Sequence, residues 1–283
     1  MDILQTQPSF LNSAIPRWIT VCSGLALLTM SVSCAPQDSN EAPVPAPAET
    51  PAAAEAVAPE QSEPESEPAT VDTSGKVLRH AVFFKFKEES SEEDVTKVAE
   101  ALAALPAEID SIVNLQWGTN NSPESHDHGF THCFLLTFND EAGIKKYLPH
   151  PAHKAFGKTL GPHRNEVFVI DYWATPSEVQ LEKELKHAVF FKFKDDADPA
   201  GVKAVEEAFA ALPSKIDAIK AFEWGTNVSG ENKDEGYTHC FMLTFDSEEG
   251  RAEYLPHPDH KAFGKVLGPV LDKVRVLDFW GKE

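Results

Sequence analysis

The chain has 283 residues and a formal net charge of −20, with 25 Lys and Arg against 45 Asp and Glu. No cluster of basic residues stands out against this acidity, which argues against a nucleic-acid partner. Nine of the acidic residues fall in residues 35–75, so this segment carries nearly half of the net charge.

Residues 1–34 have the pattern of an export signal. The stretch from Ile19 to Val32 is apolar, but it is too short to span a bilayer as a mature helix. Small residues precede Cys34, as they do at a bacterial lipoprotein processing site. We therefore expect an exported protein of the cell envelope that touches the membrane only through a lipid on Cys34. A plain secretory signal and an uncleaved anchor are the alternatives.

Residues 35–75 are predicted to be a disordered linker. They are almost entirely Pro, Ala, Glu, Ser, Thr and Val, with no Lys or Arg. Such a segment cannot bury enough apolar surface to offset its ordering entropy. Its Pro content and its like charges favour an extended tether.

The rest of the chain is a tandem repeat of one sequence unit. His80–Lys87 (HAVFFKFK) returns unchanged at His187–Lys194, 107 residues later, and the offset then holds without a gap. Trp117-Gly118-Thr119-Asn120 and Thr131-His132-Cys133-Phe134 also recur in the second unit. A unit present only twice indicates a duplicated domain rather than a solenoid. We assign residues 76–175 to the first domain, 176–185 to a connector and 186–283 to the second domain.

Each unit is predicted to contain strand, helix, strand, strand, helix and strand, in that order. In the first strand, Val77–Lys87, apolar residues lie on both faces, which indicates a sheet covered on both sides. Ser90 and Glu93 form a capping-box pattern before the first helix, and the second unit replaces it with Asp198 and Pro199. The second helix is interrupted at Pro149.

The order βαββαβ is the ferredoxin-like pattern, and it predicts an α+β fold. Helices cover one face of each sheet, and the second copy can cover the other. We therefore expect the two units to pair within one chain as an α+β barrel of the dimeric type, leaving the protein monomeric. A connector of about a dozen residues reaches roughly 40 Å when extended, which is enough for this pairing.

Histidines and a tyrosine recur at equivalent places in both units and form the candidate site. Treating the first and third strands as parallel neighbours, we expect His80 and His132 to lie near each other under the helices. Tyr147 and His153 should close the site from the second helix. The predicted pocket lining is His80, Val82, Phe84, His132 and Phe134, with His187, Val189, Phe191, His239 and Phe241 in the second unit.

Imidazole and phenol groups in an apolar pocket suit general acid–base chemistry. Burial lowers the pKa of a histidine and raises that of a tyrosine, so a neutral imidazole can act as a base and a phenol can donate to an oxyanion. Abstraction of a proton next to a carbonyl is the reaction class that fits. We nevertheless expect first a barrel that binds a small apolar or carbonyl-containing molecule, with the acid–base enzyme as the alternative and a buried polar network as the structural interpretation. Three imidazoles could also hold a metal or haem, but the spacing matches no local metal motif, so no metal or cofactor is predicted.

The segment Tyr147-Leu148-Pro149-His150-Pro151-Ala152-His153, with His80 and Asp171-Tyr172, resembles the stress-responsive A/B barrel (Dabb) family. The resemblance covers both units nearly whole, and it implies a dimeric α+β barrel. A plant cyclase of this family carries out an aldol-type cyclisation without a cofactor. The resemblance to it implies catalytic roles for Tyr147 and His153, and for Tyr254 and His260 in the second unit. An aromatic residue in that enzyme's pocket wall falls at Arg164 here and at Leu271 in the second unit, so the substrate does not carry over.

Several other residues are given structural roles. Cys133 and Cys240 lie inside apolar strands and are expected to be buried free thiols, with a bridge between the units as the alternative. His150 and His257 lie between prolines, where a capping or surface role is expected. His126, His128 and His163 are expected to be solvated. Trp117 and Trp224 should pack at the barrel edge.

Overall fold

The computed structural model describes residues 73–282. The first unit, copy one, contains β1 (Val77–Phe86), α1 (Glu92–Ala103), β2 (Asn114–Thr119), β3 (His132–Phe138), α2 (Glu141–Tyr147), α3 (Pro151–Leu160) and β4 (Arg164–Ala174). The second unit, copy two, contains β5 (Leu185–Phe193), α4 (Pro199–Ala210), β6 (Ala221–Thr226), β7 (His239–Phe245), α5 (Glu248–Tyr254), α6 (Pro258–Leu267) and β8 (Leu271–Trp280). Short 3-10 turns, Leu105–Ala107 and Leu212–Ser214, follow the first helix of each copy. The predicted export signal, Cys34 and nearly all of the predicted linker lie outside the described residues. Within residues 73–282, no helix combines the length and the hydropathy that a membrane span requires.

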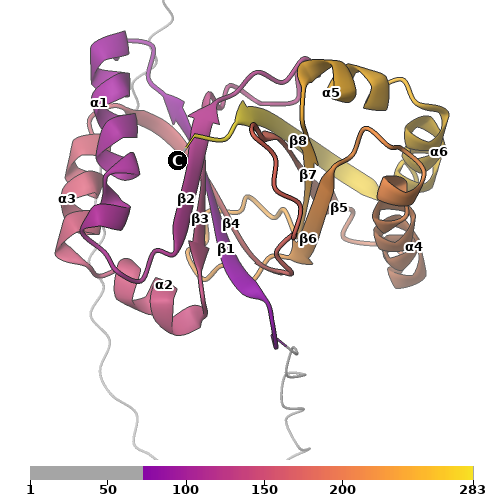
Figure 1. The fold of residues 1–283 in the computed structure, drawn as a ribbon, viewed down its shortest axis with the longest axis horizontal. Helices are drawn as coiled ribbons and strands as arrows, with labels where there is room; N and C mark the ends of the chain where they lie inside the picture. The colour runs from indigo at the N-terminus through magenta and orange to yellow at the C-terminus, as the bar shows by residue number, and fades with distance from the viewer. Residues whose placement is uncertain (1–72, 283) are drawn as a thin grey trace, which may run out of the picture. The chain divides into compact units, whose positions relative to one another are not determined.

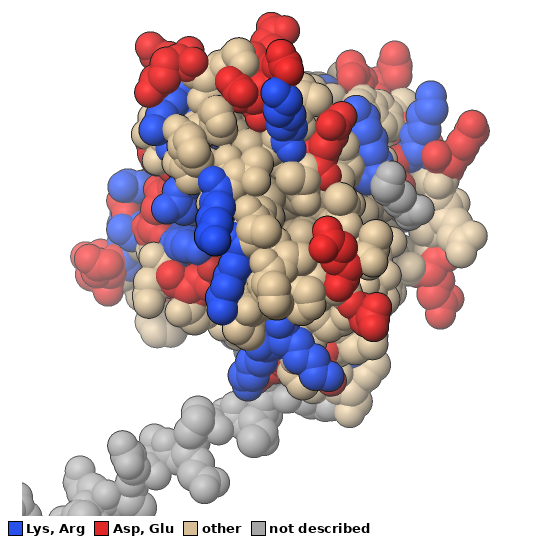
Figure 2. All heavy atoms as spheres, turned by 90° about the vertical axis from the view of Figure 1, so that its left-hand side faces the viewer, with Lys and Arg blue, Asp and Glu red and all other residues tan. Residues whose placement is uncertain are grey.

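Local sequence sets the helix starts. The Ser91 hydroxyl accepts a hydrogen bond from the Asp94 backbone N–H at the start of α1, so the cap predicted at Ser90 was wrong by one residue. Asp198 caps α4 with Pro199 in its first turn, which confirms that prediction. On the outer face of copy one, positive and negative side chains are interleaved (Figure 2), and two Glu–Lys pairs are spaced four residues apart along helices α1 and α2.

The strand order is β2-β3-β1-β4 in one sheet and β6-β7-β5-β8 in the other, and every pairing is antiparallel. The expectation that β1 and β3 run parallel was wrong. The crossover through α1 makes β1 and β2 parallel, and β3 then turns back to run between them. His80 therefore pairs with Leu136, while His132 pairs with Phe84, four residues further along β1.

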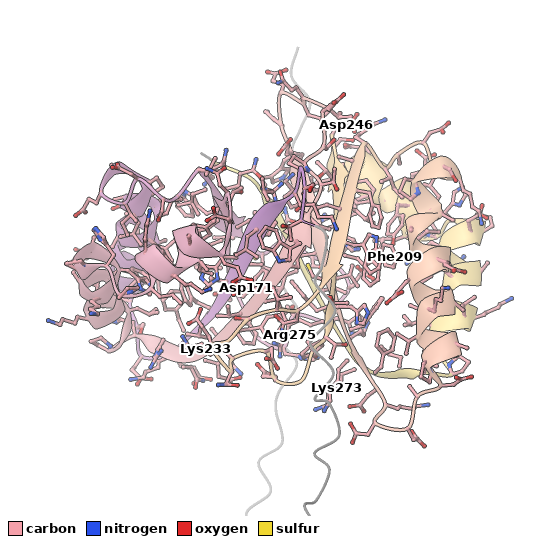
Figure 3. The ribbon with its side chains drawn as sticks, turned by 90° about the horizontal axis from the view of Figure 1, so that it is seen from below. Asp171, Phe209, Lys233, Asp246, Lys273 and Arg275 are labelled. Atoms are coloured by element: carbon pink, nitrogen blue, oxygen red, sulfur yellow. The ribbon has the colours of Figure 1, made fainter. Side chains whose placement is uncertain are left out.

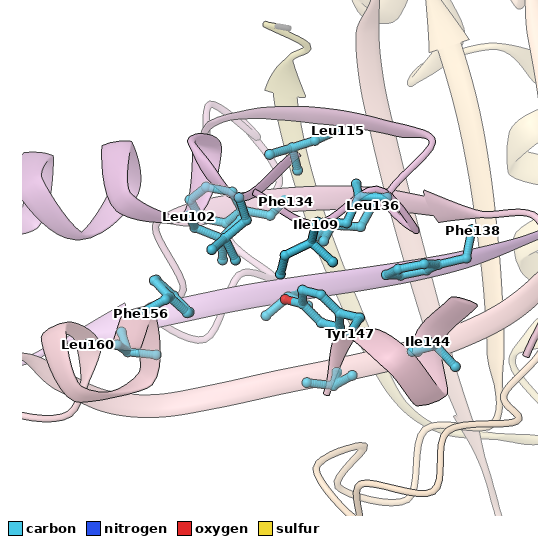
Figure 4. Close-up of a cluster of buried hydrophobic side chains, with 14 of the residues drawn as sticks. Leu102, Ile109, Leu115, Phe134, Leu136, Phe138, Ile144, Tyr147, Phe156 and Leu160 are labelled. Carbon is cyan, nitrogen blue, oxygen red and sulfur yellow. The ribbon is translucent and has the colours of Figure 1, made fainter. Parts of the chain in front are cut away.

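Each sheet buries two apolar faces. On β1, Val82 and Phe84 point toward the helices and join a cluster with α1, α2 and α3 (Figure 4), while Ala81 and Phe83 point the other way. The second face packs against the same face of the other copy. The Phe83 and Phe190 rings meet there, with centroids 5.2 Å apart. The two sheets thus stack between two outer helix layers (Figure 1), and the predicted α+β barrel of two ferredoxin-like units is confirmed.

Cys133 and Cys240 lie in this shared core as buried free thiols, as expected. A buried cation also enters the core. The Arg275 guanidinium (Figure 3) lies 4.3 Å from the Phe168 ring centroid and 4.4 Å from that of Phe130, and it pairs with Glu235 at 2.9 Å. Arg275 occupies in copy two the position that Phe168 occupies in copy one. Cation–π contacts and the ion pair together compensate the charge for its loss of water.

The loops that follow β2 and β6 cross to the other copy. We call residues 120–131 and 227–238 the crossing loops. The Asn120 Oδ1 accepts a hydrogen bond from the Asp278 backbone N–H at 2.9 Å, and the Asn121 N–H donates to the Asp278 carbonyl at 2.8 Å. Asn227 and Val228 make the same contacts with Asp171. Each loop therefore covers the exposed edge of β4 or β8 in the opposite sheet.

The motif Trp-Gly-Thr-Asn is explained by this crossing. A Cβ on Gly118 would lie 2.5 Å from the Trp280 carbonyl oxygen, and one on Gly225 would lie 2.9 Å from that of Trp173. Only glycine allows the two copies to approach this closely. Trp117 stacks on Phe134 with centroids 5.7 Å apart, and Trp224 stacks in the same way on Phe241, which confirms the packing role expected for both tryptophans.

We predict that Gly118→Ala destabilises the fold by about 1–3 kcal/mol, because the added methyl group meets backbone that cannot move without separating the copies. Gly157→Ala is the matched control. A Cβ at Gly157 meets nothing within 4 Å, so this helical substitution should be neutral or stabilising by about 0.5–1 kcal/mol. Urea unfolding of both variants measures the difference. Equal stabilities would contradict the close approach at Gly118.

Candidate functional site

The structure contains two equivalent clusters of polar side chains, one between each sheet and its helices. The first site contains His80, Tyr147, His153 and Asp171, and the second contains His187, Tyr254, His260 and Asp278. The structure thus brings together the tyrosine and two of the histidines that the sequence singled out in each copy.

A buried His–Asp pair forms the floor of each site. His80 on β1 and Asp171 on β4 are register partners, and their Nδ1 and Oδ1 atoms lie 2.6 Å apart. His187 and Asp278 repeat the pair at 2.7 Å. A carboxylate only accepts hydrogen bonds, so Nδ1 of each histidine carries a proton and donates a hydrogen bond to the aspartate. The aspartates were not predicted as site residues. Their signal was an acidic residue inside an otherwise apolar strand in both copies.

The tyrosine rings lie over these histidines. Tyr147 ends α2, and its ring centroid is 5.6 Å from that of His80 and 4.3 Å from that of His153 at the start of α3. Tyr254 repeats both contacts at 5.5 and 4.2 Å. The helix breaks at Pro149, between α2 and α3, and side chains six positions apart then come into contact.

Burial sets the protonation of this tyrosine–histidine pair. Burial, with help from the charges of Glu231 and Asp171, raises the pKa of Tyr147 far above its usual 10.0. Burial also lowers the pKa of His153, although its hydrogen bond to the Leu148 carbonyl acts in the opposite direction. Tyr254 and His260 shift in the same directions. Each pair therefore combines a protonated phenol with a neutral imidazole near neutral pH.

The Tyr147 and Tyr254 hydroxyls make no hydrogen bond with any residue from 73 to 282, although each side chain is at most 1% exposed. The Nδ1 atom of His153 donates to the Leu148 carbonyl at 3.0 Å, which leaves Nε2 free to accept. A donor and an acceptor without protein partners thus lie side by side in an apolar setting.

The second site contains a cation that the first lacks. Arg251 on α5 occupies the position of Ile144 in copy one. Its Nη1 donates to Asp278 Oδ2 at 2.7 Å and to Asn121 Oδ1, on the crossing loop of copy one, at 2.8 Å. Burial lowers the pKa of His187, but the charge of Asp278, its hydrogen bond and the charge of Glu124 outweigh burial and raise the pKa overall.

The expectation that His132 lies beside His80 was wrong, because the antiparallel register separates them along β1. The His132 ring instead contacts Phe86, with centroids 5.0 Å apart, and burial lowers its pKa. In copy two, the His239 Nε2 pairs with Glu206 on α4 at 2.9 Å. Neither of these histidines joins the Tyr–His pair of its copy. Among residues 73–282, no three His, Cys, Asp or Glu side chains are arranged to hold a metal.

The remaining predicted lining residues are part of the hydrophobic core. Val82, Phe84 and Phe134 are each at most 5% exposed and pack in the cluster around Tyr147 (Figure 4). Their counterparts Val189, Phe191 and Phe241 are buried in the same way. These side chains form the apolar floor beneath the polar groups.

The other histidines have structural positions. His150 and His257 cap α3 and α6, as expected, by accepting a hydrogen bond from the second residue that follows each of them. His128 is exposed, as expected, but its Nδ1 also contacts the Arg275 guanidinium of copy two at 3.3 Å. His126 is exposed, whereas His163 is half-buried beside Ser90, so its expected solvation is only partial.

A separate hollow of about 1360 Å³ lies between the connector and the two sheets. It is lined by Arg79, Gln116, Glu184, Lys186 and Glu223, among others, and by no member of either site. Four of its charged side chains form ion pairs: Arg79 with Glu223 at 2.8 Å, and Lys186 with Glu184 at 3.0 Å. The hollow is thus separate from the two Tyr–His sites.

We predict that His153 and His260 titrate below pH 6.5, the usual value for imidazole, and that His187 titrates above it. His153 and His260 then contribute stability that is present above pH 6.5 and is lost as the pH falls toward their lower folded pKa. His187 contributes stability that is present below pH 6.5 and is lost as the pH rises through its higher folded pKa. NMR titration of the histidine ring protons, assigned with single His→Gln variants, measures the midpoints. A His153 midpoint above 6.5 would contradict the burial argument.

Comparison with known proteins agrees with this arrangement. The family model described as "Stress responsive A/B Barrel Domain" matches residues 78–174 and 185–280. A stress-response A/B barrel domain-containing protein of Arabidopsis thaliana is 42% identical over 95 residues, which is 34% of this chain and 87% of the relative. Olivetolic acid cyclase of Cannabis sativa is 36% identical over 95 residues, covering 34% of this chain and 94% of the enzyme.

The similarity of this chain to one solved structure extends over both copies. The crystal structure of an anthrone oxidase-like protein has a TM-score of 0.54 and 11% identity, covering 74% of this chain and 92% of that one. At this identity the likeness shows the shared fold alone. The family match is of a different kind, because it covers most of the chain and falls once on each copy. The chain therefore belongs to the stress-responsive A/B barrel (Dabb) family, with two of its domains in tandem.

Proposed function

We propose that the two copies form a small-molecule-binding barrel with one ligand site at each Tyr–His pair. The ligand class is a small, largely apolar molecule that carries a carbonyl group. The apolar floor of each site suits the body of such a molecule. The phenol suits its carbonyl oxygen, because a protonated tyrosine donates a hydrogen bond.

The observation that carries this proposal is the unpartnered Tyr147 hydroxyl. The Tyr147 ring is buried, but its hydroxyl is not among the fully buried polar atoms that lack a partner, so the oxygen keeps slight access for a ligand. Tyr254 is placed in the same way, and the ring centroid of each tyrosine lies 4.2 to 4.3 Å from that of an imidazole with a free Nε2. A ligand that accepts from the phenol would satisfy the group that the protein leaves open.

Acid–base catalysis without a cofactor is the second candidate. The His80–Asp171 pair at 2.6 Å favours it, because it places an oriented imidazole next to the phenol. In this reaction a neutral imidazole, with His153 as the candidate, takes a proton from the carbon beside the carbonyl at its Nε2. Tyr147 then donates a hydrogen bond to the enolate oxygen that forms. The 36% identity to a cyclase supports the same class of chemistry.

We expect the double variant Tyr147→Phe, Tyr254→Phe to lose a co-purified ligand while keeping its melting temperature, because no protein hydrogen bond is lost. Native mass spectrometry of mildly purified protein measures the ligand occupancy, and it also reports the monomer that internal pairing predicts. If a substrate is found, the double variant should also fail to turn it over. Unchanged occupancy with a large drop in stability would instead favour a structural network.

We also propose that the barrel is displayed in the cell envelope, on a lipid at Cys34 and a tether of residues 35–75. The support is the sequence pattern of residues 1–34. Cys34→Ser should release the protein from the membrane fraction, because it removes the acceptor for the lipid. Cys22→Ser is the matched control, since Cys22 lies inside the apolar stretch, and it should fractionate as the unaltered chain does. Membrane association of the Cys34→Ser chain equal to the control would refute lipidation.

A further inference from the structure

Each crossing loop carries a glutamate to the site of the other copy. Glu231 of copy two has its Oε1 3.8 Å from the His80 Nε2 of copy one. Glu124 of copy one has its Oε2 3.8 Å from the His187 Nε2 of copy two. Neither distance is a hydrogen bond. Two carboxylates from distant parts of the sequence therefore face the two His–Asp pairs in the same way.

Both facing oxygens are buried and have no hydrogen-bond partner among the described residues. The other oxygen of Glu231 is fixed by Lys233 Nζ at 2.6 Å. A carboxylate oxygen that leaves water without gaining a donor is costly. Both copies have such an oxygen, so a chance placement of one glutamate side chain does not explain the arrangement.

The groups around Glu231 Oε1 indicate which hydrogen-bonding groups a ligand would need. Glu231 Oε1 is an acceptor, and at 3.8 Å the His80 Nε2 does not donate a hydrogen bond to it. This oxygen therefore has no donor from the described residues. Tyr147 stands close enough for the charge of Glu231 to raise its pKa, and its hydroxyl is a free donor. A ligand that complements this set carries one donor and one acceptor.

We infer that Glu231 and Glu124 determine ligand specificity in trans: each selects a neutral ligand with a hydroxyl or enol group that donates to its carboxylate. This inference rests on the proposed function and narrows its substrate class. The carbonyl oxygen of the ligand accepts from the tyrosine, and its hydroxyl donates to the glutamate. Anionic ligands are disfavoured, because two carboxylates, Glu231 and Asp171, already lie beside His80.

The loop position makes each site depend on both copies. The Val169 N–H donates to the Lys233 carbonyl at 3.1 Å, and the Asp171 N–H donates to Asn227 Oδ1 at 3.2 Å. In Figure 3, Lys233 of copy two lies near Asp171 of copy one. These hydrogen bonds fasten the loop to β4 and so hold Glu231 over the site of copy one.

The two sites are not identical. Lys233 has no cationic counterpart in copy one, where His126 stands instead, so Glu124 lacks the ion pair that fixes Glu231. In turn, Arg251 neutralises Asp278, whereas copy one has Ile144 at the position equivalent to Arg251. We therefore expect Glu231→Gln to weaken binding more than Glu124→Gln does, which makes the second variant a matched comparison.

The test uses 4-hydroxyacetophenone, which has a carbonyl acceptor and a hydroxyl donor on an apolar ring, and 4-methoxyacetophenone, which lacks the donor. Isothermal titration of the purified chain should show roughly tenfold tighter binding of the hydroxyl compound, as a hydrogen bond to a charged acceptor predicts. Glu231→Leu together with Glu124→Leu should remove this preference. The Glu124→Gln variant should keep or raise the melting temperature, since it relieves a buried carboxylate oxygen without a donor and breaks no ion pair with Lys or Arg.

A double-mutant cycle tests the exchange between copies. In the Tyr254→Phe background only the first site remains, and Glu231→Leu should abolish the preference there. In the Tyr147→Phe background the same substitution should have no effect. Coupling of Glu231 to Tyr254, its neighbour in the same copy, would overturn the assignment in trans.

The outcomes separate this inference from the proposed function. If the tyrosine variants lose the co-purified ligand and the glutamate variants keep it, the inference falls and the proposed function stands. If neither set alters ligand occupancy, both fall. Equal affinity of the unaltered chain for the two probes, or binding of neither, overturns the ligand class. A marked loss of stability in Glu231→Gln would assign the glutamate a structural role instead.

Discussion

The structure depends on the packing of one sheet against the other. Each sheet has two apolar faces, and its own helices cover only one of them. The second face, which carries Phe83 in copy one and Phe190 in copy two, would otherwise lie in water. Burying it against the equivalent face of the other copy removes apolar surface from water on both sides at once, at about 25 cal/mol per Å². The duplicated chain contains its own partner, so this burial does not depend on protein concentration.

Covalent linkage also lets the two halves diverge where a symmetric dimer cannot. Arg275 stacks on Phe168, which is its own counterpart in copy one, and a dimer of identical chains would place either two cations or two phenyl rings there. Arg251 and Ile144 make the surroundings of the two His–Asp pairs unequal. The barrel therefore contains two related sites in different electrostatic settings, and their histidines need not share a protonation state.

The crossing loops connect the fold to the proposed chemistry. They cover the edges of β4 and β8, and the same hydrogen bonds hold a carboxylate over each His–Asp pair. The glycine that admits the close approach, the asparagine that accepts from the edge strand and the glutamate that reaches the histidine follow one another along a single segment. Stability at the interface and the composition of the site thus come from the same residues.

The sequence alone determined the element order, the tandem fold and the Tyr147–His153 pair, because strand alternation, helix caps and a proline break are local signals. The tertiary structure decided the rest. It separated His132 from His80, because β3 lies between β1 and β2 and therefore runs antiparallel to β1. It added Asp171 across the sheet and Glu231 from the other copy, contacts between positions far apart in the chain. Such contacts have no periodicity in sequence, so only packing of the two sheets could place them.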